Sequence, residues 1–181
     1  MVSERVDRRG FLKGSLSLTA LVMFPELASA STKYKTISLY NTHTGEFIKN
    51  CTYCENGKYD REALRYINYI LRDYRNDEMT DMSVELLDYI HDIQVLLGKQ
   101  KKEIEIISGY RSRSTNNYLR HHTRGVAKKS YHMLGKAMDI RIPNVSTKHL
   151  RKAALALRKG GVGYYPRSGF VHIDVGPVRA W

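Results

Sequence analysis

Proline and cysteine are scarce in this sequence. Its 181 residues include 4 prolines and 2 cysteines. So few prolines argue against a proline-rich linker, and two cysteines exclude a small domain held together by several disulfides. Hydrophobic residues nevertheless make up 42% of the chain, which is enough to bury a core and excludes a wholly disordered basic tail. We therefore expect a single globular domain.

Acidic residues are also fewer than basic residues. The chain carries 18 Asp and Glu residues against 30 Lys and Arg residues, a formal net charge of +12. A charge of this size bears on partners and solubility and does not determine the fold. Nucleic acid, anionic lipid and an anionic wall polymer all suit this charge, and the charge alone does not distinguish among them.

The first 30 residues have the pattern of an export signal. Arg8 and Arg9 precede a short apolar stretch over residues 16–24, and small residues follow it up to Ala30. The alternative is an uncleaved membrane anchor, but about ten apolar residues are too few to cross roughly 30 Å of hydrocarbon. We therefore expect a signal over residues 1–30 that is cleaved, and a mature domain at 31–181 without a membrane span.

The paired arginines resemble the twin-arginine signal, which directs folded proteins across the bacterial inner membrane. Residues 31–181 retain 26 basic and 15 acidic residues, a formal charge of +11, so the positive charge belongs to the mature domain. Export to the periplasm argues against nucleic acid as a partner, because that compartment holds no chromosomal DNA. An anionic wall polymer then becomes the preferred partner.

The two cysteines lie three positions apart, at Cys51 and Cys54. An oxidising compartment would allow them to form a disulfide. The surrounding residues have the pattern of a strand, however, and residues three apart on a strand point to opposite faces, which would strain a bridge. We expect two free thiols, with a structural disulfide as the main alternative and a zinc site on this pair as a weaker one.

The hydrophobic periodicity predicts an α+β fold in which helices flank a largely antiparallel sheet. Alternation and turn residues predict a hairpin over 36–49 and later strands over 103–107, 136–142, 162–165 and 170–175. Stripes at helical spacing predict helices over 60–74, 83–97, 114–119 and 146–157. His91 falls among the polar positions of the second helix, and we expect it to face solvent.

Three residues of the second half could form a metal site. His132 and Asp139 are separated by seven positions across a glycine-bearing loop, and His172 lies on a later strand. If the two strands are neighbours, the three side chains can converge. Two imidazoles and a carboxylate suit Zn²⁺ and leave a fourth tetrahedral position for water. On spacing alone a surface pair is the simpler interpretation, because the chain has seven histidines.

Two motifs favour the metal site. The run S-x-H-x-x-G-x-A-x-D over residues 130–139 and F-V-H-I-D over 170–174 resemble the signature of the LAS-type zinc peptidases, which include lysostaphin, D-alanyl-D-alanine metallopeptidases and the sonic hedgehog domain. S-G-Y-R-S over 108–112, G-V-G-Y-Y-P over 161–166 and the ending V-G-P-V-R-A-W resemble the exported murein endopeptidase branch. The resemblance covers residues 38–181.

The resemblance implies a hedgehog/DD-peptidase-like zinc peptidase domain over 31–181, with Zn²⁺ as its cofactor. His132, Asp139 and His172 fall on the metal-ligand positions of the family. Arg111 falls where related enzymes place an arginine near the substrate, and its planar guanidinium suits a peptide carboxylate or carbonyl. The implied function is periplasmic, zinc-dependent hydrolysis of the peptide cross-links of peptidoglycan, by a monomer that binds stem peptides.

The general base departs from the family pattern. Many relatives place Glu, Asp or His two or three residues before the second metal histidine, where this sequence has Phe170 and Gly169. Neither side chain can take a proton. Asp174 is the nearest carboxylate, and we expect it to act either as the base or as a residue that orients His172. A catalytically silent peptidoglycan-binding module with the same fold is therefore the alternative function.

Other side chains could assist. Tyr164, Tyr165 or Arg111 could donate a hydrogen bond to the oxyanion of the tetrahedral intermediate, and the sequence does not rank them. His121 and His122 lie on a segment that could approach the metal, although exposed histidines of this kind are usually solvated.

Overall fold

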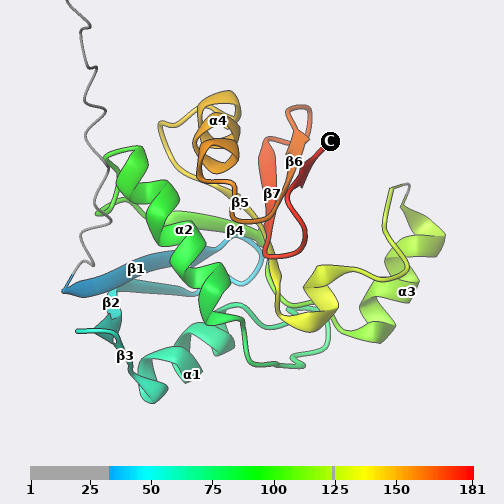
Figure 1. Cartoon of the computed structure of the whole chain (residues 1–181). Coiled ribbons are helices and arrows are strands. Elements are labelled where there is room, and N and C mark those ends of the chain that lie inside the picture. The colour runs from blue at the N-terminus through cyan, green and yellow to red at the C-terminus, as the bar shows by residue number, and fades with distance from the viewer. Residues whose placement is uncertain (1–32, 124) are drawn as a thin grey trace, which may run out of the picture. The chain divides into compact units, whose positions relative to one another are not determined.

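A computed structural model describes residues 33–123 and 125–181 of the chain. The export signal expected over residues 1–30 lies outside these residues. Among the helices that the structure describes, none is both long and apolar enough to cross a membrane. The fold is α+β, as expected, with helices packed against a twisted sheet (Figure 1).

The described residues form one eight-stranded sheet in the order β3-β2-β1-β4-β5-β7-β6-β8. The strands are β1 Tyr34–Asn41, β2 Phe47–Glu55, β3 Lys58–Tyr59, β4 Ile104–Ser108, β5 Ala137–Arg141, β6 Gly161–Tyr165, β7 Phe170–Asp174 and β8 Arg179–Ala180. Most neighbouring strands pair antiparallel, but β1 pairs with β4 and β6 with β8 in parallel. The sheet is thus mixed but largely antiparallel, as expected, and the parallel pairing of β1 with β4 is made possible by the long connection between them.

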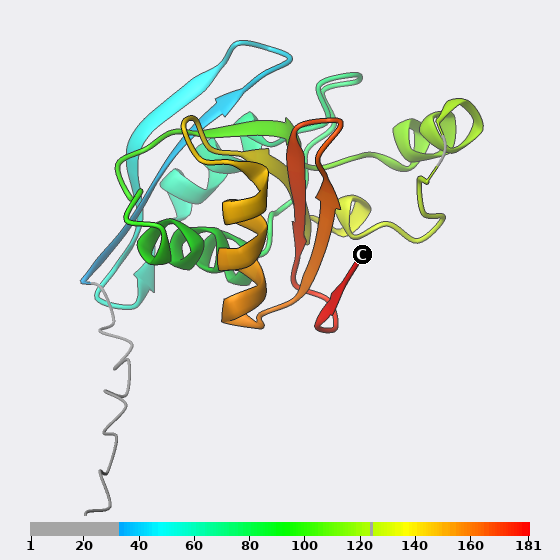
Figure 2. The same ribbon diagram turned by 90° about the horizontal axis from the view of Figure 1, so that it is seen from above.

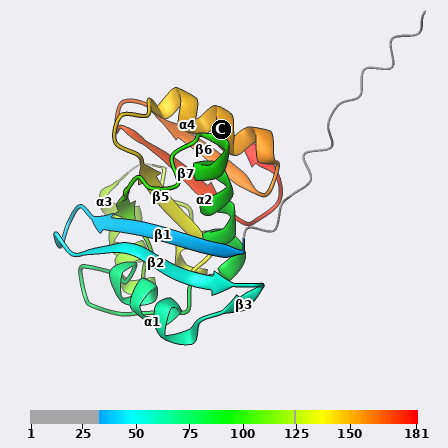
Figure 3. The ribbon, with the colours of Figure 1, turned by 90° about the vertical axis from the view of Figure 1, so that its left-hand side faces the viewer.

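The helices begin close to the starts of the predicted ranges. They are α1 Arg61–Ile70, α2 Val84–Leu96, α3 Arg113–His122, the 3-10 helix η1 Tyr131–Leu134 and α4 Thr147–Leu157. Asp60, Ser83 and Ser146 each accept a hydrogen bond from a backbone amide in the first turn of α1, α2 and α4. Figure 3 shows α1 beside β2, which lies next to β1.

Helix α1 is shorter than its apolar stripe predicts. It ends at Ile70, whereas the stripe continues to Tyr74. Tyr74 lies beyond the end of the helix, and its ring stacks on His43, with ring centroids 3.9 Å apart. The last residue of the stripe thus contacts a distant segment instead of extending the helix.

The prediction for His91 was wrong. This side chain is buried on α2, and its Nδ1 lies 3.3 Å from the carbonyl oxygen of Thr36 in β1. Helix α2 is covered on several sides, since Tyr89 on the same helix donates a hydrogen bond of 2.8 Å to the carbonyl of Ala154 in α4. A helix between a sheet and another helix has little polar face left for solvent.

Cys51 and Cys54 carry free thiols, as expected. Both lie in β2, where Cys54 is buried in the core. Burial, with a contribution from the charge of Asp60, raises the pKa of the Cys51 thiol. The pair is therefore part of the packing of the sheet.

Two features of the fold position the site. Strands β5 and β7 are antiparallel neighbours in the middle of the sheet, and Asp139 is paired with His172 across them. Between β4 and β5 the chain leaves the sheet, forms α3, and returns through η1. Figures 1 and 2 both show α3 projecting away from the rest of the domain.

Candidate metal centre

The first element of the site is η1, which carries His132. The Ser130 side chain accepts a hydrogen bond from the backbone amide of His132, and Gly135 ends the turn in the left-handed region at φ 64°. A Cβ atom on Gly135 would come within 2.5 Å of the carbonyl oxygen of Asp81. Glycine is therefore needed here both for its backbone angle and for the close approach of another segment.

The other two residues come from the paired strands. Asp139 on β5 and His172 on β7 are opposite each other, and the Nδ1 atom of His172 lies 2.8 Å from Oδ1 of Asp139. The Nε2 atom of His132 lies 3.2 Å from that same Nδ1 and 3.4 Å from Oδ1 of Asp139. The structure thus brings together the three residues that the two motifs predict, and their ligand atoms all lie within 4.8 Å of one another.

The other ring nitrogen of each histidine is held by an acceptor. Nδ1 of His132 donates to the carbonyl oxygen of Gly109 at 2.7 Å. Nε2 of His172 donates to Oδ2 of Asp174 at 3.0 Å. Since each neutral imidazole has one N–H, these bonds leave the lone pairs of His132 Nε2 and His172 Nδ1 facing each other and Asp139.

Three acceptor atoms that face one another require a cation between them. Burial raises the pKa of Asp139, but the neighbouring histidines outweigh it and hold the pKa of this carboxyl well below its usual range. Burial lowers the pKa of His172, whereas hydrogen bonds to Asp139 and Asp174 raise it, with a net result of about 9. Without a metal ion the cation is a proton on His172, and a divalent metal ion can replace it. The residues present therefore fit a metal ion with nitrogen and oxygen ligands.

The chain resembles known proteins over most of its length. A family model described as peptidoglycan L,D-endopeptidase MepK matches residues 29–181. A protein of Escherichia coli (strain K12) with this description is 46% identical over 178 residues, which cover 97% of each chain. A protein of Haemophilus influenzae (strain Rd) described as a probable peptidoglycan L,D-endopeptidase MepK is 43% identical over 156 residues, 86% of this chain and 83% of that protein. This chain belongs to the MepK family.

Membership of the MepK family confirms the resemblance to LAS-type peptidases. Arg111 follows β4 and lies beside the three-residue group. Its Nη2 atom donates to Ser108 Oγ at 3.2 Å and lies 3.8 Å from Oδ2 of Asp139. Its buried Nε has no hydrogen-bond partner among the described residues. Such an unpartnered donor can donate a hydrogen bond to an oxygen of a ligand.

Asp174 lies on the side of His172 away from the other ligands. Its side chain is 0% exposed, and besides His172 it accepts hydrogen bonds from Arg179 and from the amides of Gly176 and Gly161. Burial raises the pKa of Asp174, but hydrogen bonds from His172 and Arg179 lower it, to about 2. A carboxylate with every lone pair occupied has no free position for a proton from water.

The other sequence-predicted candidates lie elsewhere. His121 and His122 are exposed at the end of α3, where His122 Nδ1 donates to the carbonyl of Tyr118 at 2.7 Å. Neither belongs to the one three-residue ligand group found among the described residues. Tyr164 lies under the guanidinium of Arg151. These contacts engage His122 and Tyr164 away from the three-residue group.

Two residues at the C-terminus were missed by the sequence reasoning. The ring of Trp181 lies with its centroid 5.3 Å from that of His172, and its Nε1 donates to the hydroxyl of Tyr165 at 2.9 Å. Arg179 binds Asp174 through both terminal nitrogens. Trp181 is the only tryptophan of the sequence, and it ends the motif that resembles the murein endopeptidase branch. These two features could have indicated that the C-terminal segment belongs to the site.

Proposed function

We propose that this protein is a zinc-dependent murein endopeptidase of the periplasm that hydrolyses peptide cross-links of peptidoglycan. The observation that carries this proposal is the convergence of two imidazole nitrogens and one carboxylate oxygen, with lone pairs facing a common point, in a chain of the MepK family. The relatives are named L,D-endopeptidases. We therefore favour the diaminopimelyl-diaminopimelyl cross-link over the D-alanyl-diaminopimelyl one, because only the former joins an L centre to a D centre.

His132, Asp139 and His172 would hold the zinc ion. When bound, the ion supplies Lewis-acid polarisation of the scissile carbonyl and makes water a stronger acid near neutral pH. The carbonyl of Gly109 and the carboxylate of Asp174 hold the two imidazole rings in the tautomers that leave a lone pair for the ion.

Arg111 would bind the substrate beside the metal centre. Burial lowers the pKa of its guanidinium, which nevertheless stays charged, with Asp139 as the nearest anion. The free Nε–H can donate to a carbonyl or carboxylate of the stem peptide. This contact also places a positive charge where the oxyanion develops, which stabilises the transition state.

We assign Asp174 to the orientation of His172 and not to proton transfer. The support is its complete burial and its five hydrogen-bond contacts, which come from His172, from both terminal nitrogens of Arg179, and from the Gly161 and Gly176 amides. The imidazole of His172 also separates it from the other ligands. The base for this reaction is then a group other than Asp174.

The positive charge would contribute to binding of the anionic polymer through α3 and the segment that follows it. We call residues 113–129 the cationic arm. No Asp or Glu occurs between Glu105 and Asp139, and Arg113, Arg120, Lys128 and Lys129 are exposed without an ion-pair partner among the described residues.

The cationic arm is also joined to the site at both ends. Arg111 lies two residues before it, and His132 lies three residues after it. Only Thr115 and Asn116 of α3 are buried, and Tyr118 is exposed with its ring stacked on His122. Such an arm can attract the carboxylates of the stem peptides over a distance of about 10 Å and bring them toward the site.

Purified mature protein incubated with isolated sacculi tests the function. Liquid chromatography of the muropeptides should show loss of cross-linked dimers, with diaminopimelyl-diaminopimelyl dimers lost first, and His172→Ala should leave them intact. Mass spectrometry of the metal content should give about one zinc per chain. Sacculi bound without any change in the dimers would support the silent binding module, and cleavage by metal-free protein would overturn the zinc mechanism.

A further inference from the structure

The last six residues of the chain return to the metal centre. Strand β8 pairs in parallel with β6, where Arg179 is paired with Gly161. Trp181 continues this pairing, because its amide donates to the carbonyl of Val162 at 3.2 Å and its carbonyl accepts from the amide of Tyr164 at 3.0 Å. The backbone of the C-terminal segment is therefore fixed against the strand next to β7, which carries His172.

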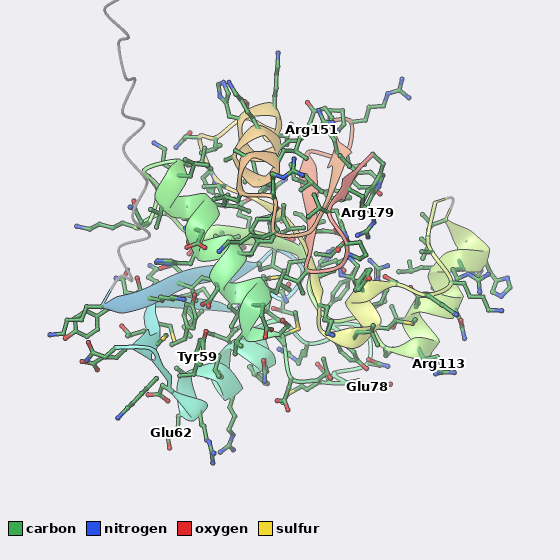
Figure 4. The ribbon with its side chains drawn as sticks, viewed as in Figure 1. Tyr59, Glu62, Glu78, Arg113, Arg151 and Arg179 are labelled. Carbon is green, nitrogen blue, oxygen red and sulfur yellow. The ribbon has the colours of Figure 1, made fainter. Side chains whose placement is uncertain are left out.

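This pairing places the guanidinium of Arg179 on Asp174. Nη2 of Arg179 donates to Oδ2 at 2.7 Å, and Nη1 donates to Oδ1 at 3.0 Å. Paired donors of this kind fix the plane of a carboxylate as well as its position. Figure 4 shows Arg179 extending from the C-terminal strand beside β6 and β7.

The guanidinium of Arg179 lies between two aromatic rings and against a glycine. It lies 5.3 Å from the ring centroid of Tyr131 and 5.0 Å from that of Trp181. A Cβ atom on Gly161 would come within 2.5 Å of both Nη1 of Arg179 and Oδ2 of Asp174. The absence of a side chain at Gly161 thus leaves room for the pair, and the rings restrict the rotation of Arg179.

The carboxylate that Arg179 fixes is the one that fixes His172. Oδ2 of Asp174 receives both Nη2–H of Arg179 and Nε2–H of His172. If the carboxylate rotated, the His172 ring could turn or change tautomer, and its Nδ1 lone pair would no longer point at Asp139 and His132. The backbone amides of Gly161 and Gly176 bind Oδ1 only, whereas Arg179 also donates to Oδ2, the oxygen that holds His172.

We propose that Arg179 is a positioning residue of the metal centre, which acts through Asp174 to direct the Nδ1 atom of His172 at the metal ion. This inference rests on the proposed zinc site. Loss of a residue that holds a metal ligand in its orientation typically lowers metal affinity by about 10- to 100-fold. Since Arg179 is partly exposed, its replacement leaves no closed cavity.

Zinc affinity of the full mature chain tests this role without any measurement of activity. The dissociation constant for Zn²⁺ would be measured by competition with a chelating dye for the wild type, Arg179→Gln, Arg179→Lys and the control Arg167→Gln. Arg167 is exposed on the turn between β6 and β7. We expect Arg179→Gln to weaken zinc binding by about 10- to 100-fold, Arg179→Lys to weaken it less because lysine keeps one charged donor, and Arg167→Gln to match the wild type.

Tryptophan fluorescence supplies a second readout. Trp181 is the only tryptophan, and its ring lies beside His172, so zinc binding at His172 should change the surroundings of the ring and with them its emission. The zinc concentration at half-change should shift in Arg179→Gln by the same factor as the dissociation constant. Circular dichroism and the melting temperature of the metal-free variants would show that each is folded.

A double-mutant cycle tests whether Arg179 acts through Asp174. In an Asp174→Asn background, Arg179→Gln should cause little further loss of zinc affinity, because the two changes disrupt one connection. A full additional loss would overturn the route through Asp174. Equal zinc affinity of folded Arg179→Gln and the wild type would overturn the positioning role alone, whereas a wild type that binds no zinc would overturn the proposed function as well.

Discussion

Asp139 and His172 are cross-strand partners, and their side chains meet with Nδ1 of His172 2.8 Å from Oδ1 of Asp139. Both residues are held in regular strands at the centre of the sheet. A site built on paired strands keeps its geometry better than one built on loops. The third residue of the candidate site, His132, is held by the η1 turn and by the carbonyl of Gly109. The metal centre is therefore largely formed before any ion binds.

Replacement of Asp139 should remove metal binding with little change in shape. Asp139→Asn keeps the size of the side chain and removes the charge that balances the cation. We expect kcat/KM on cross-linked muropeptides to fall by about 1,000-fold or more, since the metal contributes several kcal/mol to the transition state. Glu105→Gln is the matched control, because Glu105 pairs with Arg141 on neighbouring strands outside the site. Normal zinc content and activity in Asp139→Asn would exclude Asp139 as a ligand.

Replacement of Arg111 should weaken substrate binding and leave the metal in place. Arg111→Gln removes the buried charge and the free Nε–H donor. We expect kcat/KM to fall by about 10- to 1,000-fold, with zinc content unchanged, and Arg111→Lys to recover part of the loss. Steady-state kinetics and metal analysis would measure both quantities. Arg61→Gln, on the exposed first turn of α1, is the control. Unchanged kinetics in Arg111→Gln would show that Arg111 does not bind the substrate.

The sequence predicts the local parts of this site well. Alternation identifies β5 and β7, and the motifs around His132 and His172 contain the residues that the structure brings together, since both signals reside in a few adjacent residues. The pairing of β5 with β7 is a long-range relationship that spacing does not reveal. Strand β8 contains two residues, too few to show alternation, and this explains why Arg179 was missed.

Errors in the helices have a similar cause. The stripe that continues to Tyr74 follows helical periodicity, but the contact of Tyr74 with His43 comes from a distant segment. His91 occupies a polar position of an amphipathic pattern, although β1 covers that side of α2. Hydrophobic periodicity identifies one buried face of a helix. It does not show when a second element, such as a strand, buries another face.

Neutralisation of the cationic arm should weaken binding to sacculi without harming the metal centre. The triple variant Arg120→Gln, Lys128→Gln and Lys129→Gln removes three exposed charges from the arm. We expect the fraction bound to sacculi to fall several-fold at low salt, and the difference from the wild type to shrink as the salt concentration rises. Cosedimentation over a range of salt concentrations measures this effect.

The control for the arm removes the same charge from another surface. Lys101, Lys102 and Lys148 are exposed residues outside the arm, and their replacement by glutamine lowers the net charge equally. If binding depends on the arm, this variant should retain most of it. Equal losses in the two triple variants would show that total charge, and not the arm, governs adhesion.

Asp73 should make stability depend on pH. This carboxyl is 1% exposed, and it accepts hydrogen bonds from the amides of Ser112 at 2.9 Å and Arg75 at 3.2 Å. Burial raises the pKa of Asp73, but hydrogen bonds from Thr115 and Ser112 outweigh it and place the pKa below its ordinary value. A carboxyl whose folded-state pKa is lowered stabilises the fold above its unfolded pKa of about 4, and this stabilisation is lost as the pH falls further.

Asp73→Asn tests this dependence through urea unfolding at several pH values. At pH 7 we expect the free energy of unfolding to fall by about 1–3 kcal/mol, because the charged acceptor of the Arg75 amide and the buried Ser112 amide is replaced. The difference from the wild type should shrink as the pH falls below about 4, where the wild-type carboxyl gains a proton on unfolding. Glu55→Gln, at an exposed position of β2, should show no such trend. A difference between the wild type and Asp73→Asn that stayed constant from pH 7 to pH 3 would mean that the charge of Asp73 does not stabilise the start of α3.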